Sequence, residues 1–181
     1  MLVVAAWGLQ PRVLAQALEV PADVQVPLFL KATTYDRAFS NKLKADGVIH
    51  VGICYQDKNR DSIKEMEALK TALSRPVAGF KVQVSTMAIG DGEDLSRRKE
   101  WNEFSAVYIT SMRGLDLQGL LAQSHKHKVM SVSTDPELVG KGVTMGFELV
   151  GSRPKFAIHR LGAAAEGCDF SSQLLKLATI Y

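Results

Sequence analysis

Residues 48–54 form the stretch that most constrains the fold. The run Val-Ile-His-Val-Gly-Ile-Cys is almost continuously apolar and lacks the alternation of a strand with one face in water. Such a run is typical of a parallel strand whose two faces are both covered. We therefore expect a parallel sheet with helices on both sides.

The chain before the C-terminal region alternates between helical and extended patterns, as a layered α/β fold requires. A first helix is expected at residues 22–39, with Pro27 in its first turn because proline lacks an N–H. A capping box at residues 62–65 predicts the start of a second helix. Further strands are predicted at 80–85, 106–110 and 129–132, and further helices at 95–101, at 115–126 and after Asp135-Pro136.

The last forty residues predict a different arrangement. Apolar runs at 143–150 and 154–158 are separated by a glycine-containing turn, which indicates a β-hairpin. Pro154 suits an edge strand. A helical segment at 161–167 and a closing helix at 170–178 follow. The predicted fold is a three-layer α/β domain with a mostly parallel sheet, a C-terminal antiparallel hairpin and a closing helix.

The first seventeen residues have features of a signal peptide. An apolar stretch is followed by Ala15-Gln16-Ala17, an A-x-A cleavage pattern, although no basic residue precedes the stretch. We expect export, cleavage near Ala17 and one domain over residues 18–181. The alternative is an N-terminal strand of a cytosolic protein.

Composition excludes two classes of function. The 181 residues are 46% hydrophobic and 23% charged, with a net charge of +3, and basic residues are interspersed with acidic ones. Nucleic-acid-binding domains concentrate basic charge, so no nucleic-acid partner is expected. No apolar run reaches the length of a membrane span, so the chain is not expected to cross a bilayer.

Polar side chains at the predicted carboxyl ends of the strands are the candidates for a ligand site, since open α/β sheets bind ligands there. One basic residue among them suits a small anion; the alternative is ordinary polar loop chemistry. These residues are Tyr55, Thr110, Ser111, Arg113, Ser133 and Asp135.

Signatures of catalysis and of cofactor or metal binding are missing from the sequence. It contains no phosphate-binding glycine motif and no Gly-x-Ser-x-Gly elbow, and His125 and His127 lack the spacing of a helical metal pair. We expect no enzyme, no cofactor and no metal. Cys54 and Cys168 either form a redox-active pair or, as we favour, stay buried as free thiols.

The segment MGFELVGSRPKFAIHRLGAAAEGCDFSSQLLKLA, residues 145–178, resembles the end of the YfiR-like (HmsC-like) family. The resemblance implies an exported, non-catalytic regulator in the periplasm. It would bind the sensor part of a membrane diguanylate cyclase and hold the cyclase inactive, so that its release raises cyclic-di-GMP and favours biofilm. The alternative is a periplasmic module that binds a small anion, and self-association as a homodimer is left open.

Two departures from the family pattern are visible. The member that names the family has two disulfide pairs, whereas this chain has two cysteines, so disulfide-based redox control is in doubt here. Family sequences often have Asn after the last strand of the hairpin, where this chain has His159.

Overall fold

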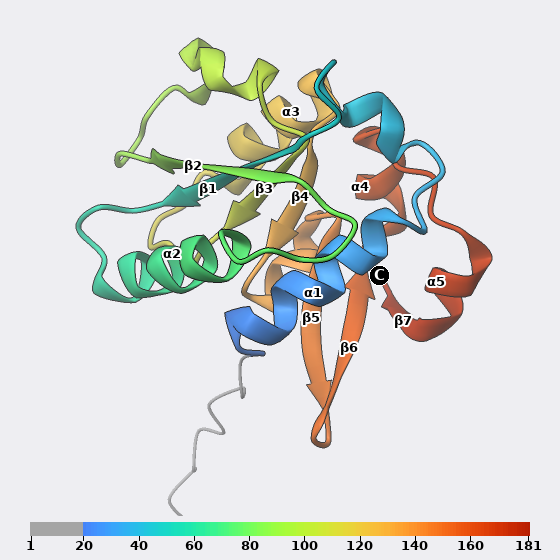
Figure 1. Ribbon diagram of the computed structural model, residues 1–181. Coiled ribbons are helices and arrows are strands. Elements are labelled where there is room, and N and C mark those ends of the chain that lie inside the picture. The colour runs from blue at the N-terminus through green and yellow to red at the C-terminus, as the bar shows by residue number, and fades with distance from the viewer. Residues whose placement is uncertain (1–19) are drawn as a thin grey trace, which may run out of the picture.

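The computed structural model describes residues 20–181, and the predicted signal peptide at 1–17 lies outside them (Figure 1). Within this range seven strands form one sheet in the order β2-β1-β3-β4-β5-β6-β7. The strands are β1 (Ile49–Tyr55), β2 (Val82–Ala88), β3 (Ala106–Ile109), β4 (Met130–Ser133), β5 (Met145–Val150), β6 (Arg153–Ile158) and β7 (Ala178–Ile180).

Five α-helices and four 3-10 helices of the described chain connect these strands. The α-helices are α1 (Ala22–Thr33), α2 (Arg60–Leu73), α3 (Leu117–His127), α4 (Arg160–Ala165) and α5 (Ser172–Leu177). The 3-10 helices are η1 (Phe39–Lys42), η2 (Leu95–Arg97), η3 (Lys99–Asn102) and η4 (Pro136–Lys141).

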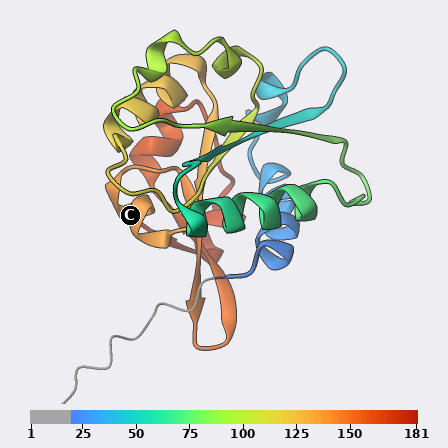
Figure 2. The same cartoon turned by 90° about the vertical axis from the view of Figure 1, so that its left-hand side faces the viewer.

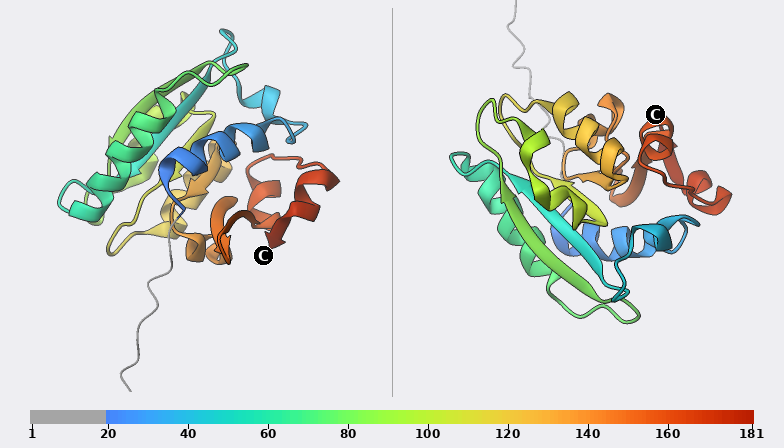
Figure 3. Two further views of the ribbon diagram at one scale, coloured as in Figure 1. Left: turned by 60° about the horizontal axis from the view of Figure 1, so that its bottom comes forward. Right: turned by 90° about the horizontal axis from the view of Figure 1, so that it is seen from above.

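Strands β1 to β5 are parallel to one another. Strand β6 pairs antiparallel with β5, and β7 runs parallel to β6. Figures 2 and 3 show α1 and α2 on one face of the sheet and α3 on the other. The hairpin of β5 and β6 extends beyond the rest of the sheet in Figure 1. The predicted fold class is therefore confirmed.

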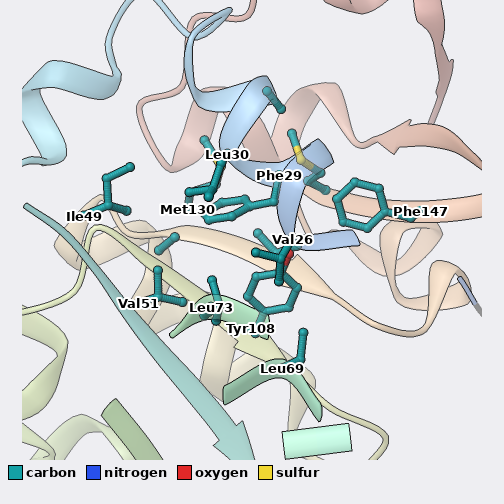
Figure 4. Packing of buried hydrophobic residues seen from close by; sticks show 14 of the residues in the cluster. Val26, Phe29, Leu30, Ile49, Val51, Leu69, Leu73, Tyr108, Met130 and Phe147 are labelled. Carbon is teal, nitrogen blue, oxygen red and sulfur yellow. The ribbon is translucent and has the colours of Figure 1, made fainter. Parts of the chain in front are cut away.

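Each face of the sheet has its own apolar core. One core lies between the strands and helices α1 and α2. In it the rings of Phe29 and Tyr108 are in edge-to-face contact, with their centroids 5.4 Å apart (Figure 4). The other core surrounds Trp101 and Leu120 beneath η3 and α3. All of β3 is inaccessible to solvent, as the predicted two-sided burial requires.

Two expectations about the first helix, its end and the position of Pro27, are wrong. The first helix ends at Thr33 rather than at residue 39, because Asp36 forms a bridge with Phe170 and its carboxylate accepts N–H groups of Ala38 and Asp169. Pro27 lies in the second turn of α1, not the first, with its ring exposed to solvent.

The capping-box prediction is also wrong in its position. Helix α2 begins at Arg60, and the Asn59 side chain caps it by accepting the N–H of Asp61 at 3.1 Å. Ser62 is fully buried, and its hydroxyl lies 2.6 Å from the hydroxyl of Thr110. Asn and Ser are both good caps, and the tertiary contact with Thr110 places Ser62 inside the helix.

Strand β7 was missed by the sequence analysis. The closing helix ends at Leu177, and residues 178–180 pair with residues 156–158 of β6. Strand β6 is therefore internal over its second half. Pro154 pairs only with Leu149 of β5, so the expectation that proline marks an open edge holds for the first half of β6 alone.

A buried carboxylate attaches the C-terminal region to the sheet. Glu166, just after α4, is inaccessible to solvent, and its carboxylate accepts the N–H of Ser131 at 2.8 Å and the Ser131 hydroxyl at 2.6 Å. Lys42 donates to the backbone oxygens of Lys128 and Glu166, not to the carboxylate. Burial raises the pKa of Glu166 to about 7, against the opposing effects of the Ser131 hydrogen bonds and the Lys42 charge.

This pKa predicts a pH-dependent stability. Between about pH 4.5 and 7 the folded protein keeps a proton on Glu166 that the unfolded chain releases, so the free energy of unfolding should fall as pH rises through that window. Relative to Glu166→Gln, the wild type should lose about 3 kcal/mol between pH 4 and pH 8. Urea unfolding of both proteins between pH 4 and pH 8 measures this loss in the free energy of unfolding. The control is Glu67→Gln, which changes an exposed carboxylate. Equal pH dependence of wild type and Glu166→Gln would contradict the assignment.

Candidate ligand site at the carboxyl ends of the strands

The order of the strands creates a crevice between the ends of β1 and β3. After β1 the chain moves outward to β2, and it then returns past β1 to add β3 and β4 on the other side. Connections therefore leave β1 and β3 in opposite directions, and in open α/β sheets such a switch point is where ligands bind. The loops that meet here follow β1, β2 and β3.

Gln56, the residue after β1, holds these three loops together. Its amide nitrogen donates to the Asp91 carboxylate at 2.7 Å and to the Arg113 backbone oxygen at 3.1 Å. Its amide oxygen accepts the Arg113 N–H at 3.0 Å. Nearby, the Asn59 amide donates to the Ser111 backbone oxygen at 3.1 Å. The polar side chains at the floor of the crevice are thus engaged in fixing its shape.

A hollow of about 760 Å³ opens beside this cluster, and we call it the Arg113 hollow. Three cationic and two anionic side chains surround it, and the Arg113 side chain is exposed. Its volume lies within the range of small-molecule sites. Its lining consists of Gln56, Lys58, Asn59, Arg60, Asp61, Asp91, Arg113 and Gly114.

The structure brings only part of the predicted rim together. Arg113 lines the Arg113 hollow, and Ser111 lines two other hollows, one of about 600 Å³ and one of about 340 Å³ that it shares with Asp135. Asp135 caps η4 through the N–H of Glu137. Tyr55 is half-buried and packs against the core.

The other two rim residues, Thr110 and Ser133, are fully buried and do not face a hollow. The Thr110 hydroxyl donates to the backbone oxygen of Cys54 at 3.0 Å, and the Ser133 hydroxyl accepts the N–H of Asp135 at 3.0 Å. These hydroxyls satisfy backbone groups where the strands end. Of the six predicted rim residues, Arg113 lines the Arg113 hollow and Ser111 and Asp135 line other hollows, so the structure does not bring the six together at one site.

Two residues that shape the hollows, Asn59 and Glu65, were not among the predicted site residues. Asn59 lies in the loop after β1, and its position after a buried strand was the available signal. Glu65 was interpreted only as part of a capping box, yet its carboxylate accepts from Ser111 and Thr134 at the ends of two other strands. Long-range contacts of this kind are not encoded in local spacing.

Both cysteines carry free thiols. Cys54 is fully buried in the core beneath α3, whereas Cys168 packs against the core on the opposite face of the sheet. Burial raises the pKa of each thiol far above its ordinary value, which keeps the thiols protonated and unreactive. A pair of cysteines separated by the sheet is not placed to form a disulfide within the chain.

The histidines occupy structural positions. The Nδ1 atom of His159 accepts the N–H of Gly162 at 2.9 Å and so caps α4. His159 therefore occupies an N-cap position, where Asn is among the preferred residues. His125 and His127 lie in the last turn of α3, and burial lowers the pKa of both.

Within residues 20–181, no group of three or more His, Cys, Asp or Glu side chains is arranged to hold a metal ion. In the same range no helix has the length and apolar character needed to cross a membrane.

Solved structures with a similar fold include binding proteins. A conserved domain protein from Vibrio cholerae O1 biovar El Tor has a TM-score of 0.67 and 14% identity over 91% of this chain. The ABC domain from Streptococcus pneumonia in complex with L-Trp has a TM-score of 0.62 and 16% identity over 88%. A ligand-free, open substrate binding protein with adhesive properties from Clostridium difficile has a TM-score of 0.61 and 13% identity over 90%. The chain spans 60% of the length of each of these structures, and at these identities the likeness shows the fold alone.

Sequence comparison identifies the family. No curated protein matches the chain. The profile of the YfiR/HmsC-like family matches residues 35–179, which begin just after α1 and end in β7. The chain therefore belongs to the YfiR/HmsC-like family, whose members are periplasmic regulators.

Proposed function

We propose that this protein is a non-catalytic periplasmic regulator that binds and represses a membrane-bound signalling protein of the diguanylate cyclase type. The observation that carries the proposal is the family match over residues 35–179. The hydrogen bonds at the strand ends support it, because Gln56, Asn59 and Thr110 hold backbone and loops in place. Because these side chains hydrogen-bond to the backbone, they fix the loops in place, as is suited to a binding protein.

Export is part of this proposal. The A-x-A pattern at residues 15–17 lies before the first described element, since α1 begins at Ala22. Cleavage near Ala17 would leave every described helix and strand in the mature domain of residues 18–181. The mature protein would then meet only the parts of membrane proteins that project into the periplasm.

Repression requires a difference in affinity between two states of the partner. A regulator shifts an equilibrium only if it binds the inactive state more tightly than the active one. Holding 99% of a cyclase inactive, against an even intrinsic equilibrium, takes roughly 2.7 kcal/mol of preference. A protein interface of standard size can provide that difference. No chemistry on the partner is needed, and release of the regulator is enough to activate the cyclase.

Deleting the gene should raise cellular cyclic-di-GMP and increase biofilm, because the cyclase loses its inhibitor. Cyclic-di-GMP is measured by mass spectrometry in wild type, the deletion strain and two complemented strains. The intact gene should restore the low level. A copy that lacks residues 2–17 should not restore it, because its product stays in the cytoplasm. Unchanged cyclic-di-GMP in the deletion strain would overturn the proposal.

A second candidate function is binding of a small anion at the Arg113 hollow. Lys58, Arg60 and Arg113 surround this hollow at the switch point of the sheet. Two of the structural neighbours are a complex with L-Trp and a substrate binding protein, so the fold is compatible with small ligands.

Thermal unfolding in the presence of carboxylates, phosphate and sulfate tests this second candidate. An anion at 100 times its Kd should stabilise by roughly 2.7 kcal/mol, a rise in Tm of about 5–11 °C for a chain of this size. Arg113→Gln should remove the rise. Arg75→Gln should keep it, because this exposed arginine lies at the other end of α2. If no anion raises Tm, or if Arg113→Gln responds like wild type, the anion candidate is wrong.

A further inference from the structure

A second hollow lies on the other side of the first turns of α2, and we call it the Glu65 hollow. Its volume is about 600 Å³, and it is bounded by the start of α1, by α2 and by the residues that follow β3 and β4. It shares Asp61 with the Arg113 hollow. Of the predicted rim only Ser111 lines this hollow, and the proposed repression of a partner assigns no ligand to it.

The Glu65 carboxylate is fixed at one wall of the hollow. Its Oε2 atom accepts the N–H of Ser111 at 2.8 Å and the hydroxyl of Thr134 at 2.6 Å. Those donors follow two different strands, so the carboxylate is held from two sides. Among the described residues no donor engages its Oε1 atom, which keeps the capacity to accept a hydrogen bond.

Gln25 adds a second unused acceptor. The residue lines the hollow from α1 and is 2% exposed. Its amide nitrogen donates to the backbone oxygen of Val20 at 2.6 Å, whereas its amide oxygen has no hydrogen-bond donor within the described chain. Buried acceptors are satisfied in most proteins, so this unpaired amide oxygen beside the hollow indicates a donor that residues 20–181 do not supply.

The remaining lining is mainly apolar. The charged side chains of the lining are two carboxylates, Asp61 and Glu65, and one cation, Lys64. An anion would meet net negative charge here, unlike in the Arg113 hollow. The apolar part of the wall is formed by Val20, Pro21, Ala22, Ala68 and Leu69.

We infer that the Glu65 hollow binds a small primary amine that carries a short apolar body. An ammonium group offers three donors and no acceptor, which matches a wall with a held carboxylate and an unpaired amide oxygen. The ion pair with Glu65 selects for the cation, and the apolar residues bury the hydrocarbon part. The hollow has room for a ligand of drug size. This site stands independently of the partner protein and of anion binding.

Binding of benzylamine, cyclohexylamine and n-butylamine to the full folded protein tests the inference. Benzyl alcohol, cyclohexanol and n-butanol are the neutral controls, because they keep the apolar body and lose the charge. At ten times its measured Kd, an amine should raise Tm by about 3–6 °C, and its matched alcohol should raise Tm far less. The amine inference fails if no amine raises Tm more than its alcohol does.

Three variants locate the site. Glu65→Gln keeps an acceptor for Ser111 and Thr134 and should weaken amine binding at least tenfold in calorimetry. Glu67→Gln removes an exposed carboxylate of the same helix and should bind as wild type does. Ala68→Phe fills the hollow from an exposed position and leaves Glu65 and its two donors unchanged in sequence, so it should abolish binding even if Glu65→Gln fails to fold. Amine binding that survives in Ala68→Phe would overturn the assignment, whatever the cyclic-di-GMP measurements show.

Discussion

Burial of the central strands on both faces is the constraint on which the rest of the structure depends. Strands β3 and β4 have no exposed residue, so apolar side chains point into a core on each side, and helices must cover both. Ser131 of β4 is hydrogen-bonded to Glu166, which offsets the cost of burying its hydroxyl, whereas the buried hydroxyl of Tyr108 in β3 has no partner among the described residues. The side chains free to meet a ligand are therefore displaced to the strand ends and the loops that follow.

Sequence periodicity predicted the layers and the hairpin, since these follow from runs of apolar residues, whereas the family was indicated by the resemblance of residues 145–178. It did not predict features decided by contacts between distant residues. Ser62 looks like a cap until Thr110 is placed beside it, and Asn59 caps α2 instead. The closing helix was expected to reach residue 178, yet residues 178–180 pair with β6 as β7. Thr110 and Ser133 seemed available to a ligand because burial at a strand end cannot be judged from local spacing.

The two hollows beside the start of α2 differ in charge. Arg113, Lys58 and Arg60 give one a cationic border, whereas Glu65 and Asp61 make the other acidic. Gln56 and Glu65 hydrogen-bond to Arg113 and Ser111 in the segment after β3, so both hollows lie against the same fixed loop. The family match supports a regulator located in the periplasm.

Fractionation of the native host with N-terminal sequencing of the recovered protein tests the central claim, that this regulator acts outside the cytoplasm. We predict a periplasmic product that begins near Leu18, after the Ala15-Gln16-Ala17 pattern. Such a product would carry every helix and strand described here and could reach a membrane sensor. A cytoplasmic product that retains Met1 would contradict the account, because repression from the periplasmic side would then be impossible.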